Sequence, residues 1–400
     1  MKVLIFDKEE RLKNTGGPTG YLYNISQYLK CHPSDSIEFV DERKLQLTRL
    51  SKVRKFMADA LNSVSKYFPW LYYTVIVYIL YDLKLSFTKD TITYLNGFDF
   101  IHVHSSPEVL CYFRKSKINA KIVLTTHCPE PVIDEFAGGR SLGRIFQKHP
   151  SLRDWCLRKE VRAYDVCDYV MFPVEQAREP YENASKIYKE KFEEIKNKFF
   201  YVPTSLNSTK PIAGIEDYVT KNNIPGDSFK LCYVGRHSEV KGYDFLKDAA
   251  VKLWGVLPNV CFLIGGMKDC KIGLADKRWI ELGWVNTPKL LNEVDAFVLP
   301  NKNTYFDLIL LEVLRQGTPV IVSKTGGNKW FESYKLDGIK FFEYGNKSEL
   351  INCVKELIAL KDNGKIEALH RSNREFFQKE FNMDLYVQRY TEALKKLMQK

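Results

Sequence analysis

The stretch KLCYVGRHSEVKGYDFLKDAAVKLWGVLPNVCFLIGG, residues 230–266, decides the fold class of this chain. An apolar run at 230–235 is followed by a helical pattern at 244–256 and by a second apolar run at 259–266. Bare apolar runs of this length are typical of parallel strands buried on both faces, and parallel neighbours need a helical crossover between them. The stretch therefore predicts a strand–helix–strand unit of a parallel α/β sheet.

The same alternation extends over both halves of the sequence. Strands are predicted at 2–6, 37–40, 100–105, 121–127, 168–173, 230–235, 259–266, 295–300, 318–323 and 339–343. This repetition predicts an α/β protein with two doubly wound, Rossmann-like domains, whose ligands bind at the carboxyl ends of the strands. The predicted domains are 1–205 and 212–380, joined by the polar linker TSLNSTKPIAG at 204–214. A final helix within 381–400 is expected to pack back across the junction.

Composition narrows the class of protein further. The chain has 400 residues, of which 45% are hydrophobic and 14% aromatic, so it can bury enough apolar surface to fold. Its nine cysteines include no C-x-x-C pair, which is typical of reduced thiols and predicts a cytoplasmic protein. The start MKVLIFDKEE lacks the pattern of a signal peptide, and the most apolar stretch, Trp70–Leu80, is too short to span a bilayer. The net charge of +11 indicates an anionic partner, which on composition alone is a nucleic acid, a phosphorylated ligand or a lipid surface.

Several common sites are missing from the sequence. It contains neither the phosphate-loop pattern G-x-x-x-x-G-K-[ST] nor G-x-G-x-x-G, and it has no D-x-D. His102 and His104 share one face of a predicted strand, but a histidine pair without a third ligand at metal-site spacing is more often structural. No metal site is therefore expected.

The loop after the strand at 230–235 carries the strongest local signal. Gly235 ends the strand, and the loop then presents Arg236 and, five residues later, Lys241 in front of Gly242. Two cations from one loop can clamp a diphosphate, and a glycine allows close approach of the backbone to a ligand. On its own, this pattern is also compatible with a solvated surface loop.

Six sequence blocks together resemble the GT-B glycosyltransferases of the large retaining family 4, over essentially the whole chain. The blocks are GG at 16–17, THC at 126–128, G-R-x-x-x-x-K-G at 235–242, IGG at 264–266, FDLILLE at 306–312 and RQGTPVI at 315–321. The resemblance implies a GT-B fold, a nucleotide-diphosphate sugar held mainly by the C-terminal domain, and an acceptor against the N-terminal domain. It implies a UDP- or GDP-linked donor and no cofactor or metal.

The resemblance also implies roles for particular residues. Arg236 and Lys241 match the cations that neutralise the leaving diphosphate, His127 matches a histidine that faces the sugar, and Glu312 matches a glutamate that accepts hydrogen bonds from the ribose. Residues expected to bind the donor are Gly17, Gly235, Gly266, Val285, Thr304, Tyr305, Phe306, Asp307, Leu308 and Ile309. The backbone N–H groups of Leu308 and Ile309, at the start of a predicted helix, would meet the phosphates.

The sequence departs from the family pattern at two of these places. Thr304 stands where the first glutamate of the E-x7-E motif is expected, eight residues before Glu312, and Cys128 stands where an aspartate is common. The loss of the first glutamate affects sugar contacts more than nucleotide binding. It leaves open a different class of protein, a catalytically silent partner subunit or chaperone of another transferase.

A basic segment precedes the most apolar part of the sequence. Between Arg43 and Lys66 there are seven Lys or Arg residues and one Asp, so that the segment carries +6. If the segment is helical, Leu50, Val53, Met57, Leu61 and Val64 share one face and Arg49, Lys52, Lys55 and Lys66 the other. Such a helix, with the apolar residues up to position 80, can lie on an anionic membrane surface. The alternative is a core helix with a solvated basic side.

The resemblance implies a hexosyltransferase that retains anomeric configuration without a metal, and the missing D-x-D agrees with the absence of a metal. Its acceptor is expected to be a glycan or lipid-linked glycan in the synthesis of surface polysaccharide or glycoconjugate. The protein is expected in the cytoplasm, peripheral on the inner face of the cell membrane. Nucleic acid is not an expected partner, because no motif of a known nucleic-acid reader is present.

Overall fold

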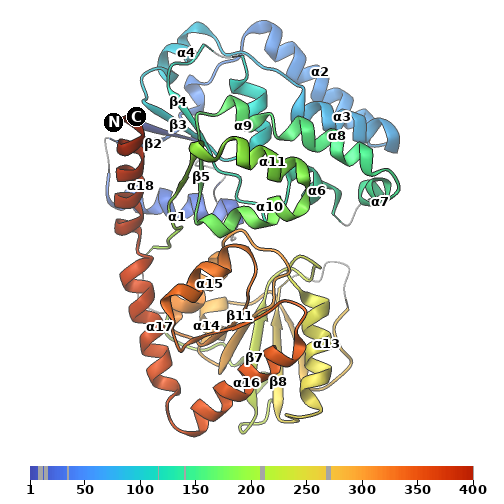
Figure 1. Cartoon of the computed structure of the whole chain (residues 1–400), viewed down its shortest axis with the longest axis vertical. Coiled ribbons are helices and arrows are strands. Elements are labelled where there is room, and N and C mark those ends of the chain that lie inside the picture. The colour runs from blue at the N-terminus through green and yellow to red at the C-terminus, as the bar shows by residue number, and fades with distance from the viewer. Residues whose placement is uncertain are drawn as a thin grey trace. The chain divides into compact units, whose positions relative to one another are not determined.

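Two parallel six-stranded sheets organise the chain in this computed structural model (Figure 1). The structure describes residues 1–7, 12, 17–33, 36–115, 117–138, 141–207, 212–266 and 272–399. The chain divides into a first unit of residues 1–173, 180–202 and 390–400, and a second unit of residues 174–179 and 203–389. Each unit contains one of the sheets.

The sheet of the first unit has the strand order β2-β1-β3-β4-β5-β6. Its strands are β1 (Val3–Phe6), β2 (Ile37–Phe39), β3 (Phe100–Val103), β4 (Lys121–Leu124), β5 (Tyr169–Phe172) and β6 (Phe199–Tyr201). All of its neighbouring strands are parallel, and β1, β3 and β4 are almost entirely buried. Continuous burial explains why these strands carry bare apolar runs and not an alternating pattern.

The sheet of the second unit has the strand order β12-β11-β10-β7-β8-β9. Its strands are β7 (Phe229–Val234), β8 (Val260–Gly265), β9 (Trp279–Gly283), β10 (Ala296–Leu299), β11 (Val320–Ser323) and β12 (Ile339–Phe342). All of its neighbouring strands are again parallel. The two sheets confirm the predicted α/β fold class.

Helices connect the strands and cover the sheets (Figure 1). In the first half of the chain they are α1 (Gly17–Cys31), α2 (Arg49–Ser65), α3 (Pro69–Tyr81), α4 (Lys89–Leu95), α5 (Ser106–Glu108), α6 (Val132–Ala137), α7 (Ser141–Lys148), α8 (Pro150–Glu160), α9 (Ala163–Val166), α10 (Glu179–Ala184) and α11 (Lys186–Glu194). In the second half they are α12 (Tyr218–Lys221), α13 (Tyr243–Trp254), α14 (Thr287–Leu291), α15 (Leu308–Gln316), α16 (Lys347–Asp362), α17 (Ile366–Glu380) and α18 (Met383–Met398). The 3₁₀ helices are η2 (Glu42–Lys44), η4 (Glu175–Arg178), η5 (Lys196–Lys198) and η6 (Gly326–Tyr334), and η3 (Val109–Phe113) is a π-helix.

Every strand predicted from the sequence is present, and two strands of the described part of the chain were missed. The first, β6, is short and its side chains are not buried; the second, β9, lies at the edge of its sheet and is largely half-exposed. The side chains of β9, WIELG, are largely half-buried, so its sequence lacks the continuous apolar run that marks the central strands. Part of the predicted linker, residues 208–211, lies outside the described residues.

A buried carboxylate connects four helices of the first unit. Glu160, at the end of α8, accepts hydrogen bonds from the hydroxyl groups of Tyr81 in α3 (2.5 Å) and Tyr188 in α11 (2.6 Å). It also accepts hydrogen bonds from the backbone N–H groups of Val132 (2.9 Å) and Ile133 (3.2 Å) at the start of α6. Burial raises the pKa of Glu160, and these four donors act in the opposite direction because they favour the charged form.

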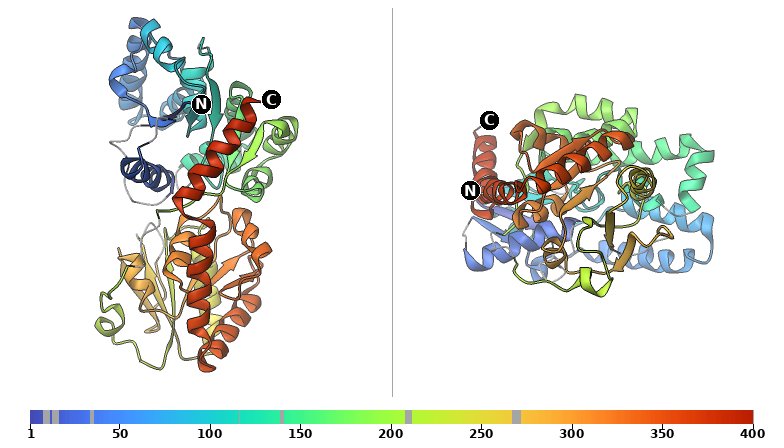
Figure 2. Two further views of the ribbon diagram at one scale, coloured as in Figure 1. Left: turned by 90° about the vertical axis from the view of Figure 1, so that its left-hand side faces the viewer. Right: turned by 90° about the horizontal axis from the view of Figure 1, so that it is seen from below.

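The last helix, α18, contributes residues to both units. Residues 383–389 belong to the second unit and residues 390–398 to the first. In the first unit, Tyr390 and Leu394 are buried, and the Tyr390 hydroxyl lies 2.9 Å from Nδ1 of His102 in β3. Figure 2 shows α17 and α18 as consecutive red helices. Within the described ranges, no helix combines the length and apolar character that crossing a bilayer requires.

Candidate functional site

The loops after three neighbouring strands of the second unit contain most of the predicted site residues. Gly235 follows β7, Gly266 follows β8, and the segment from Asn301 to Asp307 follows β10. Because β10, β7 and β8 are adjacent and parallel, their carboxyl ends meet at one edge of the sheet. This edge is where ligands of doubly wound sheets bind.

Two glycines allow these loops to pack closely. Gly242 has φ +67°, and a Cβ atom there would lie 1.7 Å from the carbonyl oxygen of Pro300. Gly266 has φ +125°, and a Cβ atom there would lie 2.0 Å from the carbonyl oxygen of Gly235. Both residues adopt backbone angles that favour glycine, and both are in contact with a neighbouring loop.

Lys241 forms an ion pair that the sequence did not reveal. Its Nζ atom lies 2.6 Å from Oδ1 of Asp307, and the two side chains are 22% and 10% exposed. The other carboxylate oxygen of Asp307 accepts hydrogen bonds from the hydroxyl of Thr304 and the amide of Asn301. Asp307 was predicted only as part of the donor site; its carboxylate neutralises one of the two predicted cations.

Arg236 differs from Lys241 in its surroundings. Its side chain is exposed and forms no ion pair with any residue that the structure describes. The Tyr233 hydroxyl donates a hydrogen bond of 2.7 Å to the backbone carbonyl of Arg236, and this bond fixes the start of the loop. The guanidinium group is therefore available to an anion.

The helix α15 starts at this edge, as predicted. Asp307 is its N-cap residue but makes no side-chain capping bond, and the backbone N–H groups of Leu308 and Ile309 are the first of the helix. The Phe306 ring packs against Phe331 (centroids 5.5 Å apart), and Tyr305 is also buried. This segment can therefore offer a ligand its backbone N–H groups, whereas the ring of Phe306 is placed in the core.

Val285 and Glu312 complete the predicted residues of the second unit. A Cβ atom at Gly265 would lie 2.7 Å from a methyl group of Val285, so the loop after β9 packs on the end of β8. Glu312 lies in the second turn of α15, and burial raises the pKa of its carboxyl group, whereas the charge of Arg315 acts to lower it.

In the first unit, His127 ends a row of three histidines. It follows β4 with φ +58°, and its Nε2 atom lies 2.8 Å from Nδ1 of His104. His102, whose ring centroid is 4.2 Å from that of His104, has Nε2 2.8 Å from the hydroxyl of Thr125 and Nδ1 close to Tyr390. His102 and His104 were predicted to be a pair of histidines without a third member, but in the structure His127 joins them.

Burial keeps these histidines neutral. It lowers the pKa of His102 and of His127 to about 3, and it lowers the pKa of His104 well below the usual value. In the bond between His104 and His127, one ring N–H therefore donates to a bare nitrogen of the other ring. At neutral pH His127 can exchange hydrogen bonds with a hydroxyl group but adds no positive charge.

Gly17 and Cys128 are two further residues of the first unit that belong to the predicted motifs. Gly17 opens α1 with φ +59°, and Gly16 lies outside the described residues. The Cys128 thiol lies 3.0 Å from a carboxylate oxygen of Glu135, and burial raises the pKa of that thiol. The thiol thus stays protonated and cannot act as the carboxylate that is common at this position.

Among the described residues, no group of three His, Cys, Asp or Glu side chains could hold a metal ion.

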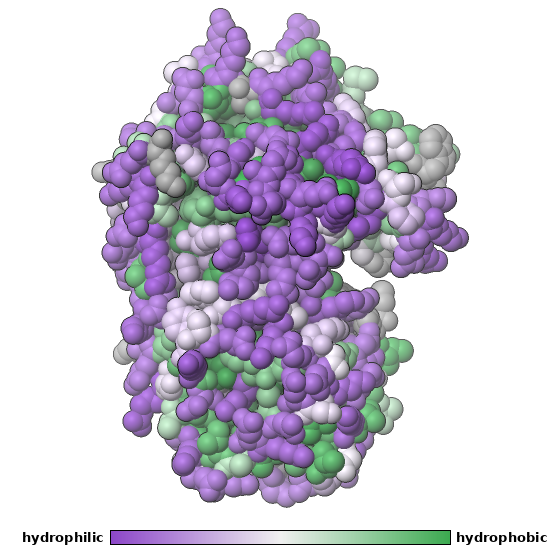
Figure 3. Space-filling view, in the orientation of Figure 1, coloured by the Kyte–Doolittle hydropathy of each residue, from purple (hydrophilic) through white to green (hydrophobic). Residues whose placement is uncertain are grey.

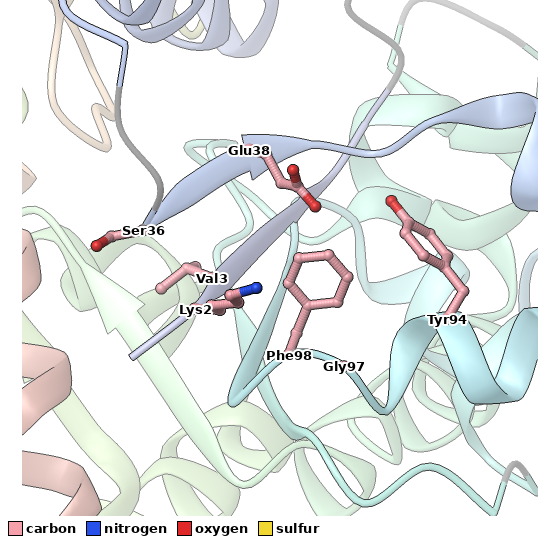
Figure 4. A pocket seen from close by; sticks show the side chains of 7 residues that line it. All are labelled: Lys2, Val3, Ser36, Glu38, Tyr94, Gly97 and Phe98. Atoms are coloured by element: carbon pink, nitrogen blue, oxygen red, sulfur yellow. The ribbon is translucent and has the colours of Figure 1, made fainter.

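One cavity lies away from the predicted residues. It has a volume of about 220 Å³ and lies at the amino ends of β1 and β2, where Glu38 and Tyr94 face it (Figure 4). No predicted site residue lines this cavity, which is at the opposite edge of the sheet from the carboxyl ends of its strands.

Comparison with a protein-family model identifies part of the second unit. Residues 228–359 match the model of glycosyl transferases group 1. This range includes β7, β8, β10 and α15, and with them the cluster around Lys241 and Asp307.

Curated relatives are similar over part of their length. A UDP-Gal:alpha-D-GlcNAc-diphosphoundecaprenol alpha-1,3-galactosyltransferase of Escherichia coli is 27% identical over 48% of this chain and 54% of the relative. The lipopolysaccharide core biosynthesis glycosyltransferase LpsE of Rhizobium meliloti is 24% identical over 44% of this chain and 52% of the relative. An uncharacterized 41.2 kDa protein in the cps region of Klebsiella pneumoniae is 24% identical over 74% and 79%. The alignments with the first two span about half the length of those relatives.

Solved structures are similar over the whole chain. The sucrose-phosphate synthase of Thermosynechococcus elongatus superposes with a TM-score of 0.62 at 16% identity, covering 100% of this chain and 99% of the other. Anabaena HepE in complex with UDP and glucose superposes with a TM-score of 0.59 at 15% identity, covering 99% of both chains. These similarities confirm the GT-B fold and, with the family match, the predicted resemblance to GT-B glycosyltransferases.

Proposed function

We propose that this chain, which carries a group 1 glycosyl transferase segment on a GT-B fold, transfers a sugar from a nucleotide-diphosphate sugar to a glycan or lipid-linked glycan. The observation that carries the proposal is the cluster of Arg236, Lys241 and the N-terminus of α15 at one edge of the second sheet. Two cations and a helix N-terminus are what a departing diphosphate needs. The named activities of the E. coli and R. meliloti relatives support synthesis of a surface polysaccharide or glycoconjugate.

The donor would be UDP- or GDP-linked, with its diphosphate between Arg236 and α15. Lys241 would exchange the Asp307 carboxylate for phosphate oxygens as the donor binds, because one ammonium group cannot fully neutralise both. Glu312 would accept hydrogen bonds from the ribose hydroxyls. The HepE structures with UDP and UDP-glucose support a uridine nucleotide as the first donor to test.

In this mechanism the diphosphate leaves from the same face on which the acceptor hydroxyl attacks, so that anomeric configuration is retained. Arg236 and Lys241 stabilise the negative charge that develops on the leaving phosphate, and the phosphate itself takes the acceptor proton. His127, neutral at the end of β4, would exchange hydrogen bonds with a sugar hydroxyl. The side-chain cations would serve the role that a metal ion has in other transferases, which makes the reaction metal-independent.

Thr304 favours a second candidate function, a catalytically silent partner subunit of another transferase. Thr304 is 1% exposed and its hydroxyl is bonded to Asp307, so the position of the first motif glutamate offers no carboxylate of its own. A silent subunit of this fold would bind nucleotide but would not turn over a donor.

The test is donor turnover by the purified full chain. Incubation with UDP- and GDP-linked hexoses and a lipid-linked glycan acceptor should release the nucleoside diphosphate, in EDTA as well as without it, whereas the R236A/K241A double variant should not release it. Proton NMR of the transferred product should show the anomeric configuration of the donor. Nucleotide binding without turnover of any donor would favour the silent subunit, and activity lost in EDTA and restored by manganese would refute metal independence.

The proposed place of this reaction is the inner face of the cell membrane. A lipid-linked acceptor remains in the bilayer, so its transferase must reach the membrane surface.

A further inference from the structure

The helix α2 presents an apolar face to solvent. We define the α2 face as the side chains of Leu50, Val53, Phe56, Met57, Leu61 and Val64, which are between 43% and 73% exposed. Figure 1 places α2 at the outer edge of the first unit, and hydrophobic residues follow that edge in Figure 3. The surface continues past the helix, where Tyr67 and Phe68 are 83% and 51% exposed.

The orientation of α2 is the reverse of that of an ordinary surface helix. Its buried residues are Ser51, Ala58 and Ser65, one small side chain every seven residues. Ala58 packs against Leu83 and Leu85, so a narrow stripe of small residues faces the protein and the large apolar residues face outward. The alternative of a core helix with a solvated basic side is therefore wrong.

Positive charge surrounds the α2 face. Arg49, Lys52, Arg54 and Lys55 are exposed, and none of them forms an ion pair with a residue in the described ranges. Asp59 is the only acidic residue of the helix.

We propose that the α2 face is a docking surface for an anionic lipid bilayer. Its apolar side chains would enter the boundary between headgroups and acyl chains while the flanking cations contact lipid phosphates. A second copy of the chain fits less well, because pairing two such faces would bring like charges together. A bilayer accommodates both features at once, and contiguous exposed apolar surface of this kind marks an interaction site. The inference does not depend on sugar transfer.

The experiment measures co-sedimentation of the full chain with vesicles. One set is pure phosphatidylcholine, and the other contains phosphatidylcholine and phosphatidylglycerol in equal parts. The apolar variant is F56Q/M57Q/L61Q, and the charge variant is K52Q/R54Q/K55Q. The matched control is V251Q/V256Q, which removes two apolar side chains of the second unit that are 57% and 55% exposed.

The native chain and the control should bind the anionic vesicles and leave the neutral ones unbound. The apolar variant should bind at least about tenfold more weakly, because it loses the side chains that would be buried in lipid. The charge variant should bind more weakly at low salt, and added salt should reduce its difference from the native chain. Equal thermal unfolding of all chains is expected, since the replaced side chains are exposed.

Three results would overturn the proposal: native-like binding by the apolar variant, equal loss of binding by the control, or no binding by the native chain. The proposal would also be wrong if the native chain is a dimer and the apolar variant is a monomer. That result would assign the α2 face to contact with a second copy of the chain. UDP binding to the second unit is measured on the same variants. This measurement tests the proposed transferase activity separately from membrane binding.

Discussion

Lys241, a candidate residue for binding phosphate, is already neutralised by its ion pair with Asp307. Their charged atoms are 2.6 Å apart, and Asp307 receives two further hydrogen bonds from Thr304 and Asn301. A diphosphate that approaches Lys241 must therefore compete with a carboxylate that its neighbours hold in position. In the proposed function, the strength of this competition would set how tightly a nucleotide binds.

Replacing Asp307 should tighten nucleotide binding. The Asp307→Asn variant keeps the size of the side chain and removes the competing charge, so the dissociation constant for UDP or GDP should fall by roughly tenfold, or about 1.4 kcal/mol. Lys241→Ala should weaken binding and lower donor turnover by about 10², the scale of losing one preorganised charge contact. Isothermal titration calorimetry on both variants makes the comparison, and weaker binding by Asp307→Asn would show that the carboxylate supports the nucleotide.

The neutral histidine row predicts a loss of stability in acid. Because the pKa of His102 and of His127 is lowered from 6.5 to about 3, the unfolded chain binds more protons than the folded chain between these values. The free energy of unfolding should therefore fall as the pH falls from 6.5 toward 3, by up to about 1.4 kcal/mol per pH unit for each histidine. Above pH 6.5 this contribution is constant.

Urea unfolding at several pH values below 6.5 tests this dependence. His102→Asn should make the decline less steep than in the native chain, by roughly the contribution of one histidine. His32→Asn, which replaces an exposed histidine of the same unit, is the matched control and should leave the slope unchanged. Parallel curves for His102→Asn and the native chain would contradict the prediction.

At the scale of elements, the central strands and the last helix were predictable because burial leaves a direct mark on the sequence. The apolar runs at 230–235 and 259–266 became β7 and β8, and the pattern at Met383–Met398 became α18. The edge strand β9 was not predictable, because most of its side chains are only half-buried and its sequence has no continuous apolar run. For α2 the sequence defined which residues share a face, but only the packed structure shows which face points outward.

The helices around Glu160 depend on one carboxylate. Glu160→Gln keeps the volume of the side chain but places an N–H₂ group opposite a hydroxyl or backbone donor, so at least one hydrogen bond is lost in a buried environment. The free energy of unfolding should fall by about 2–4 kcal/mol.

Hydrogen exchange should detect this effect first in α3, α6 and α11, which Glu160 joins to α8. Glu190→Gln, in α11 but half of an exposed ion pair with Lys186, is the control and should change the free energy of unfolding by less than about 1 kcal/mol. A native-like urea midpoint for Glu160→Gln would mean that the hydrophobic contacts of these helices hold them without the carboxylate.

At the scale of the whole molecule, the candidate site follows from the order of the strands. Gly235, Arg236 and Lys241 could be predicted because they are close in sequence to a strand end, and sheet topology brings such ends together. The pairing of Lys241 with Asp307, 66 residues later, and of His104 with His127, 23 residues later, could not be predicted. Such pairs depend on how loops from different strands settle against each other, which local sequence does not encode.

The close packing of loops at Gly242 and Gly266 limits how this sequence can evolve. Any side chain at Gly242 would overlap the carbonyl of Pro300, and any at Gly266 would overlap that of Gly235. In a library of all single substitutions, both positions should be nearly empty among surviving clones. Arg236, exposed in the loop between Gly235 and Gly242, can change without disturbing the packing. Selection could therefore alter this proposed ligand-contacting residue while the surrounding backbone stays fixed, so that new donor preferences would arise without a new fold.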